Sequence, residues 1–400
     1  MDSRFDWIKT PGTSRLMGVL NEIGEARFVG GCVRDSLLGV PPGHAGRTDI
    51  DIATTTEPGV VMKALEKARI RVIPTGIEHG TVTAIIDRVP YEITTLRSDV
   101  TTDGRRAIVA FTTDWRADAL RRDFTINALY LSVDGTVYDD VGGQTDLAAG
   151  VVRFIGVAED RLREDFLRIL RFLRFTARFS DQLDETGWAA CVACRDGLDR
   201  LSKERIWSEI SKLFATARAP MVLQAAIADG VLSHVVEQKG HVDHFRRVHA
   251  AVDGRVSPGL GVAALWQGLP RRALQAAFKP SNELLDQVAS IEMAAGELAR
   301  SMPVRHVLYR HGRDVTRDAA LVQSARTGQP TDAQVAREIE KWPIPALPLS
   351  GKDFVAAGLA PGPLVGQAVS QFERDWIAAD FPSEPDTISR LMNSVIRRLA

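Results

Sequence analysis

Two patterns of apolar spacing divide the chain. Up to about residue 140, short apolar runs rich in β-branched residues alternate with stretches rich in glycine, proline and aspartate, which is typical of strands and turns. From about Glu159 onward, apolar residues recur every three or four positions, which is typical of amphipathic helices. The chain is therefore expected to begin with a mixed α and β region and to continue as helices.

The first region predicts strands at residues 27–29, 48–53, 81–86 and 91–95, and helices at residues 2–24, 32–38 and 60–68. A hairpin is predicted from residues 129–133 to 137–140, because Asp134-Gly135 is a strong two-residue turn signal. Between these elements, from residue 97, a polar glycine-containing loop is expected to lead to a short helix or turn ending at Asp123.

Asp49 and Asp51 lie two residues apart on the predicted strand 48–53. Because side chains alternate along a strand, both carboxylates should leave one face, while Ile50 and Ile52 point into the core. Adjacent carboxylates repel each other and are stable mainly when a cation lies against them, and oxygen ligands of this kind suit Mg²⁺. An isolated D-x-D is commonly only a pair of solvated charges, so the neighbouring sequence must show whether these two aspartates bind a metal ion.

Just before this strand, residues 27–29 run into Gly30-Gly31 and then into a helix, a turn whose backbone N–H groups can bind phosphate. The order strand, Gly-Gly, V-R-D helix, loop and D-x-D resembles the nucleotidyltransferase signature of class II CCA-adding enzymes and bacterial poly(A) polymerases. The resemblance implies an α+β fold: a polymerase-β-like head with a mixed β-sheet, followed by an all-helical neck, body and tail. It also implies that Asp49 and Asp51 hold two Mg²⁺ ions.

The segment RRDFTINAL, beginning at Arg121, resembles the second motif of this family. Adjacent arginines suit a polyphosphate, because a guanidinium binds phosphate oxygens in a bidentate manner. The resemblance implies that Gly31, Arg34 and Arg122 bind the triphosphate or the sugar of a nucleotide. Glu92, on the strand 91–95, is either a third carboxylate at the metal site or a solvated strand residue.

One long helix is predicted from Glu159, and one of its faces carries arginine at every third or fourth position. Arg168, Arg171, Arg174 and Arg178 have no lysine or glutamate among them, and a stripe of like charges repels itself unless an anion or an aromatic ring covers it. Phenylalanines 172 and 175 lie between the arginines. This face is therefore expected to be covered.

Asp165 and Arg168 offer an acceptor beside a donor, which matches the amino group and ring nitrogen of cytosine or adenine. Uracil and guanine present the reverse pattern and would leave buried polar groups unpaired. The run E-D-x-x-R, from Glu164, also resembles the base-selecting motif of the family. The resemblance implies that Asp165 and Arg168 read the base, with Arg171 and Arg174 as orienting or phosphate-binding residues.

The composition of the chain limits its possible partners and its possible location in the cell. The chain of 400 residues has 45% hydrophobic residues, 25% charged residues and a net charge of −1, so any nucleic-acid binding must use local basic patches. No apolar run is long enough for a membrane span, and neither a signal peptide nor a disulfide framework is indicated, which favours the cytoplasm. Cys191 and Cys194 are expected to be buried helical thiols, and the histidines at 241, 244 and 249 are expected on the surface.

The second region predicts an amphipathic helix at residues 201–214, capped by Ser202. It resembles a further motif of the family, which implies that it lies in the neck and that its Glu204 and Arg205 stabilise the Asp165 helix. The predicted domains are the catalytic head (1–147), the neck with the base-selecting helix (148–225), the body (226–340) and the tail (341–400). Residues 348–372 of the tail are expected to form two helices joined through Gly358 to Pro363, a plausible contact for RNA phosphate.

The resemblance implies addition of C, C and A to the 3′ end of tRNA from CTP and ATP, with release of pyrophosphate. A poly(A) polymerase of the same family is an alternative. A CC-only or A-only enzyme is another, although residues 98–107 are long enough to supply the loop that CC-only relatives lack. An inactive RNA-binding or nucleotide-binding module is the alternative of a different class. The sequence does not indicate an oligomeric state.

Overall fold

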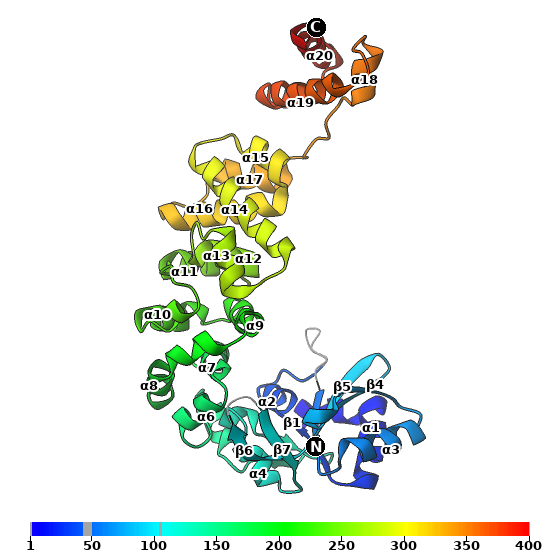
Figure 1. The fold of residues 1–400 in the computed structure, drawn as a ribbon, viewed down its shortest axis with the longest axis vertical. Helices are drawn as coiled ribbons and strands as arrows, with labels where there is room; N and C mark the ends of the chain where they lie inside the picture. The colour runs from blue at the N-terminus through cyan, green and yellow to red at the C-terminus, as the bar shows by residue number, and fades with distance from the viewer. Residues whose placement is uncertain (1, 43–49, 104–105, 400) are drawn as a thin grey trace. The chain divides into compact units, whose positions relative to one another are not determined.

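The computed structural model describes residues 2–42, 50–103 and 106–399. They divide into two compact units, Met1–Glu237 and Gln238–Ala400. The first unit contains a mixed α and β head followed by helices, and the second unit is helical (Figure 1). The predicted α+β class and the helical remainder are confirmed.

The head is built on one sheet, which within the described residues has seven strands in the order β3-β4-β5-β2-β1-β8-β9. The β2 and β5 strands pair in parallel and the other pairs are antiparallel, so the predicted mixed sheet is confirmed. The strands are β1 (Ala26–Val29), β2 (Ile50–Thr54), β3 (Arg71–Gly76), β4 (Thr81–Ile86), β5 (Val89–Thr95), β8 (Tyr130–Leu131) and β9 (Val137–Tyr138).

Strand β3 was not predicted, because it lies at the edge of the sheet, contains Pro74 and lacks a buried alternating face. A second difference is the segment after β5, for which the sequence predicts a loop. It forms a two-stranded antiparallel sheet of β6 (Arg97–Asp103) and β7 (Arg106–Phe111). The apolar run in β7 favours this hairpin.

Several helices of the head begin at a proline or a glycine. The predicted helix 2–24 is two elements, a 3₁₀ helix η1 (Ser3–Lys9) and α1 (Pro11–Ile23), because Pro11 lacks an N–H and is tolerated only in a first turn. The others are α2 (Gly31–Leu37), α3 (Pro58–Lys67), η3 (Ile77–His79), α4 (Trp115–Leu120), η4 (Thr125–Asn127) and α5 (Gly143–Ala148). The predicted helices at 32–38 and 60–68 are thus confirmed.

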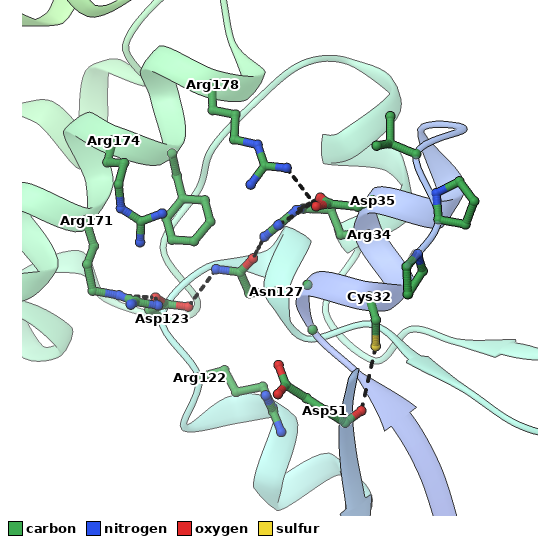
Figure 2. A pocket seen from close by; sticks show the side chains of 16 residues that line it. Cys32, Arg34, Asp35, Asp51, Arg122, Asp123, Asn127, Arg171, Arg174 and Arg178 are labelled. Atoms are coloured by element: carbon green, nitrogen blue, oxygen red, sulfur yellow. Dashed lines mark hydrogen bonds and ion pairs between the residues drawn. The ribbon is translucent and has the colours of Figure 1, made fainter. Parts of the chain in front are cut away.

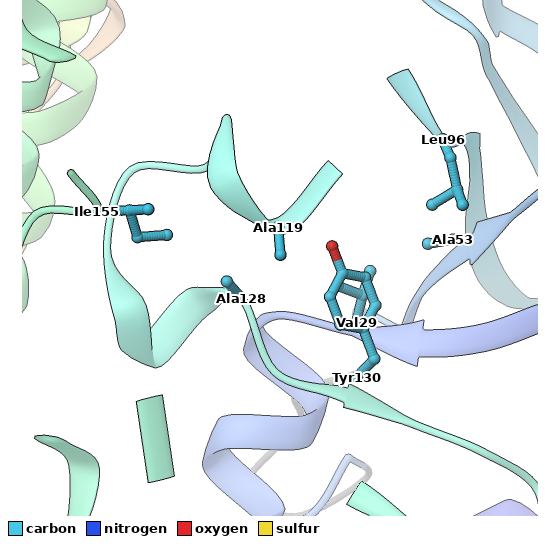
Figure 3. Close-up of a cluster of buried hydrophobic side chains, with 7 residues drawn as sticks. All are labelled: Val29, Ala53, Leu96, Ala119, Ala128, Tyr130 and Ile155. Carbon is cyan, nitrogen blue, oxygen red and sulfur yellow. The ribbon is translucent and has the colours of Figure 1, made fainter. Parts of the chain in front are cut away.

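A buried cluster joins the sheet to the helices around it (Figure 3). Tyr130 of β8 has no exposed surface, and the other members come from β1, β2, α4 and from segments between the regular elements. The tyrosine hydroxyl donates a hydrogen bond to Asp118 at 2.7 Å, which satisfies a polar group inside an apolar cluster. The cluster comprises Val29, Ala53, Leu96, Ala119, Ala128, Tyr130 and Ile155.

The long helix predicted from Glu159 is in fact two helices, α6 (Ala158–Glu164) and α7 (Leu167–Phe179). Asp165 between them has extended backbone angles, φ −156° and ψ 102°. Phe166 packs onto Gly197, where an added Cβ would lie 2.1 Å from its ring. This long-range contact explains why the helical repeat in the sequence does not continue through Asp165.

Unit 1 ends with α8 (Glu185–Ala193), η5 (Arg195–Arg200), α9 (Lys203–Phe214), α10 (Ala219–Ala228) and η6 (Leu232–His234). Ser202 accepts a hydrogen bond from the Arg205 N–H, so the predicted cap of α9 is confirmed. Cys191 and Cys194 are buried free thiols, as expected, with Cys194 at the end of α8. His249 of unit 2, by contrast, is buried against Phe245 rather than on the surface, because it lies on the side of its helix that faces the interior of the unit.

Unit 2 consists of α11 (Val242–Ala251), α12 (Pro258–Leu265), α13 (Arg271–Phe278), α14 (Asn282–Ala299), α15 (Val304–His311), α16 (Arg313–Thr327), α17 (Ala333–Lys341), α18 (Gly351–Ala356), α19 (Pro363–Ala378) and α20 (Pro385–Leu399). The two helices expected within 348–372 are α18 and α19, joined as predicted. No helix within the described residues combines the length and apolar composition needed to cross a membrane.

Candidate active site

A cavity of about 560 Å³ opens between α2, the start of β2, the segment after α4 and the arginine face of α7 (Figure 2). We call it the arginine pocket, because its described lining includes five arginines against three aspartates. The charged and amide residues among them are Arg34, Asp35, Asp51, Arg122, Asp123, Asn127, Arg171, Arg174 and Arg178, with Gly30, Gly31, Cys32, Val40, Pro41, Pro42 and Phe175 completing the wall. Such a wall suits a polyanion that also needs an acidic group nearby.

Arg34 is held at the base of this pocket with 4% of its surface exposed. Its Nε donates to Asp35 at 2.9 Å, and its Nη1 donates to the side-chain oxygen of Asn127. The guanidinium also lies 4.4 Å from the ring centroid of Phe179, a cation–π contact. Burial lowers the pKa of Arg34, and the negative charge of Asp35 partly offsets this decrease. The preceding turn needs a glycine, because Gly30 has φ +72°.

Asp123 connects this arrangement to α7. Its Oδ2 accepts hydrogen bonds from Arg171 at 2.8 and 2.5 Å, and its Oδ1 accepts one from Asn127 at 3.1 Å. Burial acts to raise the pKa of Asp123, but Arg171 and Asn127 outweigh it, so the pKa is lowered. For Arg171, burial is outweighed by Asp123, and its pKa is raised. The pair is therefore charged at neutral pH.

Arg122 is fixed from below by the buried carboxylate of Asp118. Its Nε and Nη2 donate to Asp118 at 3.1 and 2.9 Å, and Nε also reaches the hydroxyl of Tyr130 at 3.1 Å. Burial opposes its charge, but Asp118 outweighs burial and raises the pKa of Arg122. A guanidinium has five N–H groups, so these contacts through Nε and Nη2 leave Nη1 for the pocket.

Arg174 is held in a similar way by α9. Its Nε donates to the buried Glu209 at 2.5 Å, and its guanidinium lies 4.3 Å from the ring centroid of Phe175. Phe172 and Phe175 are buried, as the covered face of the helix predicted. The arginine stripe is thus neutralised by carboxylates and covered by rings rather than solvated.

Asp51 lines the pocket from β2, and the flanking Ile50 and Ile52 are buried, as alternation predicted. In the parallel register Asp51 lies opposite Glu92 of β5. Glu92 is exposed and is not part of the pocket lining. Asp49 lies outside the described residues, so its position beside Asp51 remains a prediction.

Asp165 and Arg168 do not line the pocket, and within the described residues their side chains pair with other residues rather than with each other. Asp165 accepts from Arg205 at 2.7 Å, as the predicted role of Arg205 requires, and from the Leu167 N–H at 3.1 Å. Arg168 pairs with Glu164 at 2.5 Å. Because Arg168 precedes the pocket residue Arg171 by three positions, it lies one turn away on the same helix face.

Of the predicted site residues, Gly31, Arg34, Asp51, Arg122, Arg171 and Arg174 meet in the arginine pocket. Sequence reasoning did not assign site roles to Asp35, Asp123, Asn127, Phe175 and Arg178, which also line it. Their signal was present, since they belong to the V-R-D, R-R-D-F-T-I-N and arginine-helix segments. Within the described residues no group of three or more histidines, cysteines and carboxylates could hold a metal ion.

Comparisons with known proteins agree with this geometry. The family described as the poly A polymerase head domain matches residues 26–153, and the one described as a probable RNA and SrmB-binding site of polymerase A matches residues 182–239. The mitochondrial CCA tRNA nucleotidyltransferase 1 of Mus musculus is 33% identical, over 91% of this chain and 85% of that protein. The chain belongs to the CCA-adding tRNA nucleotidyltransferase family.

Bacterial members of the CCA-adding family are similar over almost the full length. The CCA-adding enzyme of Limosilactobacillus fermentum is 30% identical, over 96% of both chains. The crystal structure of the Bacillus stearothermophilus CCA-adding enzyme in complex with CTP has a TM-score of 0.79 and 28% identity, covering 97% of this chain and 99% of that one. The fold of the CCA-adding family therefore extends through both units of this chain.

Proposed function

We propose that this chain adds C, C and A to the 3′ end of tRNA, using CTP and ATP and releasing pyrophosphate. Membership of the CCA-adding family over nearly the whole chain supports this activity. The observation that carries it is that Asp51, Arg122 and the arginine face of α7 open onto one cavity. Its volume of about 560 Å³ lies within the range typical of small-molecule sites.

The proposed reaction is an in-line displacement at the α-phosphorus of the nucleotide. The RNA 3′-hydroxyl loses its proton to solvent, and its oxygen forms the new bond to the α-phosphorus. The bond from that phosphorus to the bridging oxygen breaks, and pyrophosphate leaves with that electron pair. Arg34, Arg122, Arg171 and Arg174 hold the triphosphate or the sugar by charge-assisted hydrogen bonds, and their carboxylate partners fix them before the nucleotide binds. The turn at Gly31 leaves the backbone accessible to a phosphate, since an added Cβ would meet nothing closer than Arg34 at 3.8 Å.

Asp51, at the start of β2, fits a hard divalent cation, because it lines the pocket and carboxylate oxygens are the ligands that Mg²⁺ prefers. Asp49 and Asp51 would hold two Mg²⁺ ions, with Glu92, opposite Asp51 in the register, as a third carboxylate. Such ions, when bound, would lower the pKa of the 3′-hydroxyl and neutralise the departing pyrophosphate.

Base choice is assigned to Asp165, which lies between α6 and α7, and to Arg168, which lies one turn along α7 from the pocket residue Arg171. Arg205 and Glu164 hold them through contacts of 2.7 and 2.5 Å, so both groups have a fixed orientation. An acceptor beside a donor would pair with C or A and would leave U or G unsatisfied. The nucleotide would therefore be selected without a nucleic-acid template.

The remaining assignments concern the chain as a whole. The proposed parts are the catalytic head (1–147), the neck (148–225), the body (226–340) and the tail (341–400), and the tail would contact tRNA phosphates. The proposed compartment is the cytoplasm. Within the same family, a poly(A) polymerase and a CC-only or A-only enzyme are the alternatives that an activity assay must separate.

The test uses three tRNA transcripts, which end before CCA, before CA and before A, with Mg²⁺ and the four NTPs singly and in pairs. Products are resolved at single-nucleotide length. CTP alone should add two residues to the first transcript, ATP alone should extend only the third, and the two together should stop after three. Long A tails indicate a poly(A) polymerase, and products that stop at CC or begin only at A indicate the partial enzymes. Binding of CTP without any incorporation indicates an inactive module.

A further inference from the structure

Asp35 and Arg178 connect α2 of the head to the last turn of α7, across the arginine pocket (Figure 2). The Nη2 of Arg178 donates to Oδ2 of Asp35 at 2.7 Å, although the two residues are 143 positions apart in the chain. The other oxygen of Asp35 accepts from Nε of Arg34 at 2.9 Å. One carboxylate therefore lies between two guanidinium groups.

The two guanidinium groups are held close to each other as well as to Asp35. Both lie over the ring of Phe179, that of Arg34 at 4.4 Å and that of Arg178 at 4.6 Å from the centroid. Arg34 is almost fully buried, and the nearby charge of Arg178 adds to burial in lowering its pKa. Two like charges in a partly buried site repel strongly unless a carboxylate separates them.

These contacts form one end of a continuous path between the head and α7. From Arg34 the path continues through Asn127 to Asp123, which binds Arg171 of α7. The head thus holds α7 at two points, Arg171 and Arg178, which are seven residues or about two helical turns apart. Two points along its axis fix both the distance and the direction of a helix.

We propose that Asp35 and Arg178 are positioning residues that keep α7 in register with α2, so that base selection on α7 and triphosphate binding by Arg34 act on one nucleotide. This inference rests on the proposed function. It assigns these two residues no contact with the reacting atoms. Their effect passes through Arg34 on one side and through the base-reading end of α7 on the other.

The arrangement predicts an unusual relationship between single and double substitutions. Asp35→Asn leaves two neighbouring cations without their shared anion, so α7 should be displaced and Arg34 misdirected. Arg178→Gln removes one cation but leaves Arg34 paired with Asp35. The double variant removes the shared anion together with one of the two cations that it separates, so it should be less impaired than Asp35→Asn alone. Independent structural roles would instead give additive losses.

The experiment measures kcat and KM for CTP with a tRNA that ends before CCA, the rate ratio of CTP to UTP, and the equilibrium binding of CTP by calorimetry. We expect Asp35→Asn to lower kcat/KM about tenfold or more, mainly through KM for CTP, and to reduce the CTP-to-UTP ratio, with KM for tRNA unchanged. The double variant should recover at least about threefold of this loss, and Arg178→Lys should retain most of the activity. Thermal unfolding of every variant is recorded in parallel.

The matched control is Arg153→Gln, which removes an arginine that binds Asp146 in the same unit but does not line the arginine pocket. It should leave all of these constants unchanged. The inference is overturned if the losses of Asp35→Asn and Arg178→Gln add in the double variant, or if CTP binding and the CTP-to-UTP ratio stay at the wild-type value in Asp35→Asn. A wild-type protein that adds no nucleotides contradicts the proposed function instead, and calorimetry still tests the pair.

Discussion

The buried carboxylate of Asp118 holds the guanidinium of Arg122 from one helical turn away, through two hydrogen bonds of 3.1 and 2.9 Å. Asp118 has 1% of its surface exposed and does not line the arginine pocket, whereas Arg122 does. Asp118 also binds Arg121 at 2.5 Å and accepts a hydrogen bond from the hydroxyl of Tyr130. The orientation of a pocket arginine is therefore determined in the core beneath the pocket.

Asp118→Asn should accordingly weaken both the fold and nucleotide binding. Removing one partner of a buried ion pair leaves the other charge uncompensated and typically costs about 3 kcal/mol or more. Urea unfolding measures the stability and calorimetry measures CTP affinity. The control is Asp160→Asn, whose exposed pair with Arg163 should contribute less than about 1 kcal/mol. Equal effects of the two substitutions would contradict the importance of Asp118.

The same carboxylate gives the stability a pH dependence. Burial acts to raise the pKa of Asp118, but Arg122 and Arg121 outweigh it and lower the pKa to about 2. Because the folded pKa lies below the unfolded value of 3.8, the ionised group stabilises the fold fully above about pH 5, and this stabilisation is lost as pH falls from about 4 towards 2. It amounts to about 2 kcal/mol.

The measurement compares urea unfolding of the wild type and of Asp118→Asn at pH 6, 4 and 3. The difference between their free energies of unfolding should be largest at pH 6 and should shrink as the solution becomes more acidic. Other carboxylates, including Asp123 with its lowered pKa, contribute to both curves alike. A difference that stays constant over this range would show that Asp118 does not titrate as inferred.

Whether a pocket residue could be predicted from the sequence depends on how far along the chain its contact partners lie. Gly31, Asp51 and Arg122 were found because each lies in a short motif with its own chemistry, and Arg171 and Arg174 because helical spacing places them on one face. These patterns need only neighbouring residues. Six of the sixteen described lining residues, and the mixed sheet that carries the pocket, could be predicted in this way.

The other residues were missed because their partners are remote in sequence. Asp35 is given its position by Arg178, 143 residues away, and Asn127 by Arg34, 93 residues away. The break at Asp165 likewise depends on the packing of Phe166 onto Gly197, which no local repeat reveals. Tertiary contacts override the local pattern at these three places.

Asp51→Ala should abolish nucleotide addition while leaving the fold intact, because it removes a proposed metal ligand from the wall of a cavity rather than from the core. Glu92→Gln is the informative companion, since Glu92 is exposed but lies opposite Asp51 in the register. If it is a third ligand, addition should slow measurably, though less than in Asp51→Ala. Single-turnover rates measure the effect on addition, and thermal unfolding checks that the fold is intact. An unchanged rate in Glu92→Gln would identify Glu92 as a solvated strand residue.

Asp165→Ala should reduce the selectivity for C and A over U and G more than it slows the addition of a correct nucleotide. The carboxylate is the proposed acceptor for the amino group of C or A, and it would face the carbonyl of U or G. Its removal takes away that mismatch, while the mismatch between Arg168 and the ring N–H of U or G remains. The ratio of kcat/KM for CTP to that for UTP should fall by about 100-fold, because CTP loses a hydrogen bond worth about 1 kcal/mol and UTP is relieved of one unpaired polar group that costs roughly 1–3 kcal/mol. Triphosphate binding, measured with CTP at equilibrium, should change less than this ratio.

Arg205→Gln provides the control for that change, because Arg205 binds Asp165 at 2.7 Å from α9 but is assigned no contact with the nucleotide. If Arg205 only orients the carboxylate, its loss should give a smaller decrease in the same ratio, and Arg205→Lys should restore part of it. If UTP and GTP remain excluded in Asp165→Ala, base selection does not depend on this aspartate. The acceptor would then have to come from another carboxylate near the pocket, for which Asp123, already within reach of Arg171, is the first candidate to substitute.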